Sequence, residues 1–223
     1  MLPRAGDRLG RIPPWASRWL GYRASPPAPL SPYLVYFWSF IAAFCGLSVL
    51  QAIFNYSDYF KSRHVPGIIA SYGASAVLVY GAPQAPLAQP RAVLGGHFLS
   101  ALIGICITKL FSLMPSDAKF ESLRWLAASL STSIAIVVMQ VTDTTHPPAG
   151  ATALLPAVDA DIWNLSWYYL PVVLLSSVMV LAVALLINNI QRAYPVYWIA
   201  PTPPSKVQQQ PSESPKTPPF PQP

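Results

Sequence analysis

The chain has 223 residues, of which 53% are hydrophobic and only 10% are charged, and its mean hydropathy is +0.40. Soluble domains carry about 25% charged residues, so this composition excludes an ordinary soluble protein and predicts an integral membrane protein. The net charge of +6 does not indicate nucleic-acid binding, because the basic residues lie mostly in the two tails. Membrane lipid headgroups are the expected anionic neighbours.

Four apolar stretches are long enough to cross a bilayer core about 30 Å thick. They are residues 33–54, 92–113, 125–142 and 165–189. Two further apolar stretches are too short for a straight span and contain glycine, alanine or proline. They are residues 67–80 and 147–158. The expected fold class is therefore an all-α membrane protein with four full transmembrane helices and two short, broken or re-entrant helices.

The predicted membrane domain covers residues 33–192 and lies between two tails. Residues 1–32 are basic and rich in proline, and residues 193–223 are rich in proline, so we expect both tails to be disordered. An arginine-rich start is also found in organelle transit peptides, which leaves an organelle inner membrane as an alternative location, although prolines interrupt the helix that such peptides need.

The order of apolar stretches suggests an internal repeat of long, short and long segments. GASAVL begins at Gly73 and GATALL at Gly150, 77 residues later. If the short segments cross the membrane, each copy has three spans and the two copies have inverted topology; if they are re-entrant, the protein has four spans. The bias of Lys and Arg predicts a multi-pass protein with both termini in the cytosol in either case.

The string DTTHPPAGAT, residues 143–152, is the strongest local motif. Proline favours the first helical turn, so a short helix is expected to start at Pro147 or Pro148. The free backbone donors that follow, together with small side chains, could bind an anion at the helix start. These candidate ligand-binding residues are Ala149, Gly150, Ala151 and Thr152.

Two alternatives remain open at the same motif. Asp143, Thr144 and Thr145 could simply cap a buried helix end, which competes for the donors that an anion would use. His146 could contact the anion or relay a proton, with Asp143 as its hydrogen-bond partner.

The first copy of the repeat offers its own ligand candidates. Arg91 lies in the first turn of a helix, the unfavourable end of the helix dipole for a cation, and therefore needs a negative partner. That partner is either a lipid phosphate or a bound or permeating anion, and Gln89 could add an amide donor. His97 starts a small, polar face that fits either helix packing or a pore lining.

No enzyme is predicted. The sequence contains no GxSxG, HExxH, P-loop or dinucleotide motif. The cysteines Cys45 and Cys106 lie in apolar stretches and indicate neither a disulfide framework nor a metal site, so no metal or other cofactor is expected.

THPPAGATALL and SYGASAVLVYGAPQAPLAQPRAVLGGHFLSALIG closely resemble the HPP family of integral membrane proteins, over about residues 30–192. The family is described as having four transmembrane helices, and members from plastids and cyanobacteria are similar to nitrite transporters. Carried over position by position, the motif residues are Gly73, Ala74, Pro83, Pro86, Gln89, Pro90, Arg91, Gly95, Gly96, His97, His146, Pro147, Pro148, Gly150 and Thr152. The resemblance implies a role in small-anion transport.

The sequence therefore predicts a multi-pass transporter or channel for a small monovalent anion, with nitrite as the leading candidate. A chain of 223 residues is small for a transporter. If transport by alternating access needs two units that move relative to each other, a homodimer would be the simplest way to supply them. The alternative function is that of a non-transporting structural or regulatory membrane protein whose polar residues only assemble a helical bundle.

Overall fold

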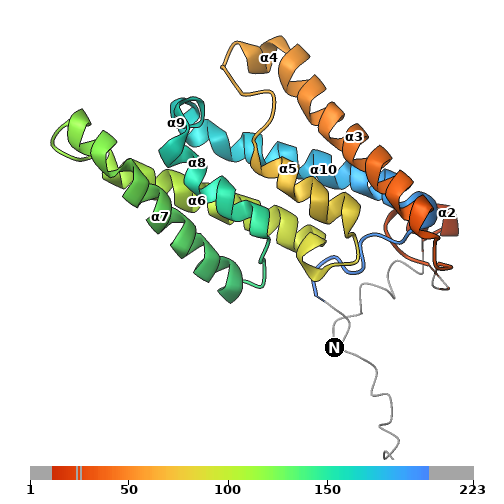
Figure 1. The fold of residues 1–223 in the computed structure, drawn as a ribbon. Helices are drawn as coiled ribbons and strands as arrows, with labels where there is room; N and C mark the ends of the chain where they lie inside the picture. Colours follow the sequence, from red (N-terminus) through yellow and green to blue (C-terminus); the bar gives the residue numbers. More distant parts are fainter. Residues whose placement is uncertain (1–11, 24, 26, 201–223) are drawn as a thin grey trace, which may run out of the picture.

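The computed structural model describes residues 12–23, 25 and 27–200, and every regular element within them is helical (Figure 1). In this part of the chain, four segments are long and apolar enough to cross a membrane, which confirms the predicted fold class. Three of them are single helices, and the fourth is interrupted near its start. They are α3 (Pro32–Tyr56), α6 (Pro90–Phe111), α7 (Asp117–Val141) and the segment Ala160–Gln191, which contains α9 (Ala160–Leu165), η3 (Ser166–Tyr168) and α10 (Tyr169–Gln191).

The two short apolar stretches form short helices. The first consists of α5 (Ser71–Ala76) and a π-helical turn, η1 (Val77–Gly81). The second is α8 (Pro147–Val158), whose 12 residues give a length of about 18 Å. Its start at Pro147 confirms the expected helix start. The remaining elements connect or flank these helices; they are α2 (Pro14–Trp19), α4 (Asp58–Lys61) and η2 (Pro86–Ala88).

One end of the helical body, here called the near end, holds the starts of α3, α6 and α8. Arg192 at the end of α10 donates to the carbonyl oxygen of Tyr80 at the end of η1, at 3.0 Å. Arg91 at the start of α6 donates to the carbonyl oxygen of Thr142 at the end of α7, at 2.6 Å. The ends of η1, α7 and α10 therefore also lie at the near end (Figure 1).

The opposite, far end holds the remaining helix termini. Arg124 in the second turn of α7 donates to the carbonyl oxygen of Ala157 at the end of α8, at 2.6 Å. The Arg63 guanidinium, in the loop after α4, stacks on the ring of Tyr168, just before α10. The described chain thus passes between the two ends six times, with four long and two short passes.

The direction of these passes resolves the topology that the sequence left open. In the first copy, α3 and α6 run from the near end to the far end, and α5–η1 runs back between them (Figure 1). In the second copy, α7 and α10 run toward the near end and α8 runs away from it. The two copies are therefore inverted relative to each other, as expected for odd-numbered repeats.

The ordered body extends beyond the expected 33–192 domain on both sides. The side chains of Arg18 and Arg23 donate to the carbonyl oxygens of Asn189, Ile190 and Arg192. These cations satisfy free carbonyls at the negative end of α10, which explains why the part of the N-terminal tail from residue 12 packs on the body. Tyr194, in the C-terminal tail, is fully buried and donates to the carbonyl oxygen of Ala88 at 2.7 Å. The rest of the expected tails, residues 1–11, 24, 26 and 201–223, lies outside the described residues.

Candidate functional site

Five polar side chains meet in the interior between the short helices and α6. They are here called the central cluster, which consists of Ser71, Ser75, His97, His146 and Thr152; each is at most 2% exposed. Burial of this many polar groups is costly unless each one has a hydrogen-bond partner. The structure meets that requirement through one connected set of bonds.

His97 lies between the two short helices. Its Nε2 lies 2.8 Å from Ser75 Oγ on α5, and its Nδ1 lies 2.7 Å from Thr152 Oγ1 on α8. On one side the ring stacks on Tyr72, with 4.5 Å between the ring centroids. Thr152 in turn donates to Ser71 Oγ at 2.8 Å. One imidazole on a long helix thus joins both short helices.

His146 forms the second half of the central cluster. Its Nε2 lies 2.9 Å from Ser75 Oγ, and its Nδ1 lies 2.8 Å from the carbonyl oxygen of Leu87. The Ser75 hydroxyl therefore bridges the two imidazoles, whose ring centroids are 4.9 Å apart. His146 belongs to the segment that enters α8, and Leu87 belongs to η2, just before α6.

The inverted repeat explains why two hydroxyls flank one imidazole. Ser75 and Thr152 occupy the same position of the repeated motif, 77 residues apart. Each therefore projects from its short helix at the equivalent place, and the two helices converge at His97. Our reasoning from the sequence missed Ser71 and Ser75 as site residues. Aligning the two copies would have identified Ser75 as the counterpart of Thr152.

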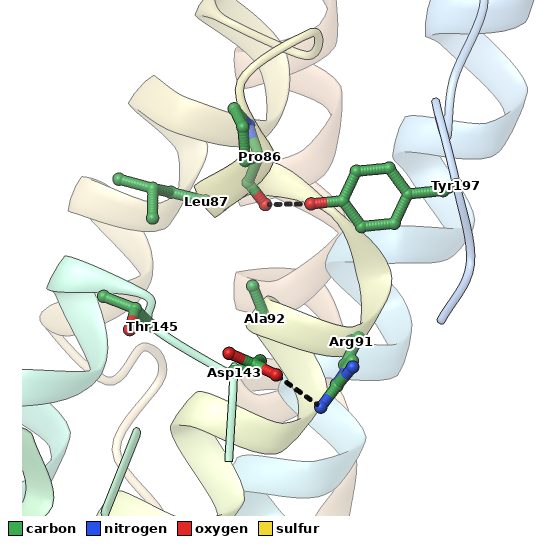
Figure 2. Close-up of a pocket in the computed structure, with 7 residues that line it drawn as sticks. All are labelled: Pro86, Leu87, Arg91, Ala92, Asp143, Thr145 and Tyr197. Carbon is green, nitrogen blue, oxygen red and sulfur yellow. Dashed lines mark hydrogen bonds and ion pairs between the residues drawn. The ribbon is translucent and has the colours of Figure 1, made fainter. Parts of the chain in front are cut away.

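A cavity of about 170 Å³, here called the near-end pocket, lies beside the central cluster. It is lined by Pro86, Leu87, Arg91, Ala92, Asp143, Thr145 and Tyr197, and Figure 2 shows these side chains around it. Leu87 links the pocket to the cluster, since its carbonyl oxygen accepts the bond from His146. Thr145 precedes His146 in the chain, so the pocket and the cluster share one wall.

Arg91 is the cation of the near-end pocket, and its charge is only partly neutralised. Its guanidinium donates to the carbonyl oxygens of Thr142 and Ile199, at 2.6 and 3.1 Å. Its contact with the Asp143 carboxylate is long, at 3.7 Å, and the Asp143 side chain is 84% exposed (Figure 2). An exposed pair of this kind is weak, so a small anion could replace the carboxylate.

Asp143 is not the partner of His146 that the sequence suggested. Both ring nitrogens of His146 bond to other groups, and Asp143 pairs with Arg91 instead. The backbone at Asp143 has φ +52°, a conformation that asparagine and aspartate tolerate better than most residues. This turn directs Asp143 toward the pocket while His146 faces the interior.

Gln89 has a structural role in the described chain. It is fully buried; its Nε2 donates to the carbonyl oxygens of Pro83 and Ala85, and its Oε1 accepts from the backbone of Val196. Both N–H donors of the side-chain amide and one of the two lone pairs on its oxygen are thereby occupied. Gln89 holds the 82–89 connector against the C-terminal segment, and the expected amide contact to an anion has no support in this geometry.

The start of α8 has fewer free backbone donors for an anion than the sequence suggested. The N–H of Ala149, expected as an anion donor, bonds to the carbonyl oxygen of His146 at 2.9 Å. No cap from a side chain is formed at His146, so the capping alternative has no support in this turn. Gly150 and Ala151 are half-buried, and of the four residues proposed there only Thr152 belongs to the central cluster.

The glycines of α6 allow close packing. A Cβ at Gly96 would lie 2.8 Å from the carbonyl oxygen of Thr144, and one at Gly95 would lie 2.6 Å from Thr144 Cγ2. A Cβ at Gly104 would overlap the carbonyl oxygen of Ala153. By contrast, Gly73 has open space around the Cβ position. The small face of α6 thus lets α8 and its entry segment approach His97.

Within the described residues, no group of three His, Cys, Asp or Glu side chains is close enough to hold a metal ion. Cys45 and Cys106 are free thiols. The arrangement instead offers a cationic pocket that adjoins a buried chain of hydroxyls and imidazoles.

The fold and site define a multi-pass α-helical membrane protein with inverted repeats and a polar centre. The sequence model of the HPP transmembrane region matches residues 28–195, and the chain belongs to this family. It is 36% identical over 184 residues to a transmembrane protein of Dictyostelium discoideum, covering 81% of this chain and 62% of that protein. It is 39% identical over 164 residues to a second transmembrane protein of the same organism, covering 72% of this chain and 50% of that protein.

The chain therefore spans less than two thirds of the length of either relative. No solved structure matches the chain.

Proposed function

We propose that this protein transports a small monovalent anion across a membrane, with nitrite as the leading candidate. The observation that carries the proposal is that the cationic near-end pocket adjoins the central cluster at Leu87, which lines the pocket and whose carbonyl oxygen bonds to His146. In transporters built from inverted repeats, substrate sites lie near the midplane where broken helices from the two copies meet. The central cluster lies where the short helices of the two copies meet, which supports a substrate site there.

The charge and size of the near-end pocket favour a small anion. Arg91 supplies a fixed positive charge whose carboxylate partner is long and exposed. Planar guanidinium groups are well suited to small oxyanions because they offer parallel N–H donors. A volume of about 170 Å³ accommodates a three-atom anion with a few waters, since each water takes about 30 Å³.

The resemblance to nitrite-transporter-like HPP proteins supports nitrite among the small anions. A buried cluster of hydroxyls and imidazoles also suits a weakly hydrated, monovalent ion better than a multiply charged one, because ion desolvation cost rises steeply with charge. We further propose that the near end faces the cytosol, as the bias of Lys and Arg predicts, and that no enzymatic step accompanies transport.

The proposal is tested by nitrite uptake into liposomes that contain the purified full chain, comparing Arg91→Gln with Lys109→Gln. Both variants remove one cation from α6, but Lys109 lies in the last turn, at the opposite end of the helix from the near-end pocket. Loss of a charge-assisted contact of about 1.5–3 kcal/mol predicts at least about tenfold weaker uptake for Arg91→Gln. Lys109→Gln is expected to stay within about twofold of the wild type.

Arg91 also supports the carbonyls of Thr142 and Ile199, so the amount of folded protein is measured by size-exclusion chromatography. Arg91→Lys, which keeps the charge without the planar group, should retain part of the uptake. Equal uptake in wild type and Arg91→Gln, or loss of folded protein in proportion to uptake, would favour the packing role instead.

A further inference from the structure

The hydrogen bonds of the central cluster determine where its protons lie. The carbonyl oxygen of Leu87 can only accept, so His146 must carry a proton on Nδ1. If His146 is neutral, its Nε2 accepts, and the Ser75 hydroxyl must donate to it. Ser75 has a single hydroxyl proton. The bond between Ser75 Oγ and His97 Nε2 therefore requires a proton on that nitrogen.

The contacts of His97 Nδ1 determine the remaining proton positions in the central cluster. Thr152 donates its single hydroxyl proton to Ser71 Oγ, so the bond between Thr152 and His97 Nδ1 requires a proton on Nδ1 as well. His97 is then an imidazolium. If instead Thr152 donates its proton to His97 Nδ1, its bond to Ser71 Oγ is given up and both imidazoles are neutral. The central cluster therefore has two hydrogen-bond arrangements that differ by one proton, and in both of them Ser75 donates to His146 at 2.9 Å in place of its longer contact, at 3.3 Å, with the carbonyl oxygen of Ser71.

The extra proton can move between the two rings through Ser75. His97 Nε2 gives its proton to Ser75 Oγ while the Ser75 hydroxyl gives its own proton to His146 Nε2. His97 then keeps its proton on Nδ1, and His146 becomes the imidazolium. Both contacts are short, at 2.8 and 2.9 Å, so the transfer needs no movement of the rings.

The surroundings strongly disfavour a second extra proton. The titratable side chains next to the rings are the tyrosines Tyr72, stacked on His97, and Tyr169, which bonds to the carbonyl oxygen of Thr152. No carboxylate among the described residues bonds to either imidazole, and the Arg91–Asp143 pair lies in the adjoining near-end pocket. Two imidazolium rings 4.9 Å apart would repel each other strongly in this interior.

We infer that the central cluster carries one proton, shared by His97 and His146 through Ser75, and that a monovalent anion crosses only with this proton. The inference rests on the proposed function. One positive and one negative charge form a neutral pair, which removes the cost of placing either ion alone at the centre of a membrane. Transport is then electroneutral, with one proton per anion, and responds to a pH gradient and not to membrane voltage.

The test uses the full wild-type chain in liposomes and measures nitrite flux and proton flux together, the latter with a trapped pH-sensitive dye. Protein-free liposomes supply the baseline, because nitrous acid crosses lipid unaided. We expect protein-dependent uptake that rises as the external pH falls, about one proton per nitrite, and no response to a potassium diffusion potential. Saturable nitrite exchange without proton movement, or with a strong voltage response, would overturn the inference while leaving the proposed function intact.

Absence of any saturable flux, including exchange at equal pH, would overturn both proposals.

Variants then test the residues involved. Ser75→Ala removes the bridge between the imidazoles and should lower proton-driven uptake at least tenfold, whereas Ser75→Thr places the residue of the other copy at this position and should restore part of it. Ser100→Ala is the control, because Ser100 is buried on α6 beside His97 but bonds only to the Met139 sulfur. Folded Ser75→Ala protein with unchanged proton coupling would also contradict the inference.

Discussion

Gly104→Ala tests whether direct contact between α6 and α8 holds the central cluster together. A Cβ at this position would overlap the carbonyl oxygen of Ala153, well inside the 3.0 Å that real Cβ atoms keep from other heavy atoms. Backbone atoms cannot move aside as a flexible side chain can, so α8 must shift away from α6. Thr152 precedes Ala153 and would move with it.

The expected cost of Gly104→Ala has two parts. Overpacking of a close contact costs about 1–3 kcal/mol. The bond between His97 Nδ1 and Thr152 Oγ1, now 2.7 Å, would lengthen toward the 3.2 Å limit of a good hydrogen bond, which costs about 1 kcal/mol more. We therefore expect a loss of about 2–4 kcal/mol in the free energy of unfolding, together with reduced nitrite uptake.

The matched control for this variant is Gly73→Ala. Gly73 also lies in a helix of the repeated motif, but the space around its Cβ position is open. Alanine should therefore be neutral or stabilise the helix by up to about 1 kcal/mol. Thermal unfolding in detergent measures both variants, with uptake measured in liposomes. Equal unfolding temperatures for Gly104→Ala and Gly73→Ala would refute the argument that α8 packs against α6 through its backbone.

Three further substitutions test individual contacts. Thr152→Val should leave His97 Nδ1 without its partner, cost about 1–3 kcal/mol and reduce uptake, whereas Thr152→Ser should keep both properties near wild type; unfolding and flux assays compare the pair. Gln89→Leu should cost about 2–5 kcal/mol by leaving three backbone groups without their bonds, and an unfolding scan with no change would contradict this. Asp143→Asn should lower the KM for nitrite, since it frees Arg91 from a competing carboxylate, and a raised KM would argue against an anion at Arg91.

The long helices and the starts of α6 and α8 were predictable because their signals are local. An uncharged run of about 20 residues defines a membrane helix, and proline marks a first turn. The structure confirms that α8 begins at Pro147 and that Arg91 lies in the first turn of α6, which begins at Pro90. The inverted topology was one of two alternatives in the sequence, and the contacts of Arg91 and Arg192 at the near end select it.

The partners within the site were less predictable because they depend on where distant segments meet. Nearness in sequence suggested Asp143 as the partner of His146, but one left-handed residue turns Asp143 away from it. The actual partners of His146, Ser75 and the Leu87 carbonyl, lie 71 and 59 residues away. Spacing along one helix cannot indicate such contacts, although the offset of 77 residues between the two copies aligns Ser75 with Thr152.

The most direct test of the central claim is nitrite flux through the wild-type protein in liposomes, measured against protein-free liposomes with nitrate and chloride as competitors. The account predicts saturable, protein-dependent nitrite flux that at least one competing monovalent anion inhibits. Flux no greater than that of protein-free liposomes, from well-folded protein and for all three anions, would contradict it. The polar centre would then be a packing feature of a non-transporting membrane protein.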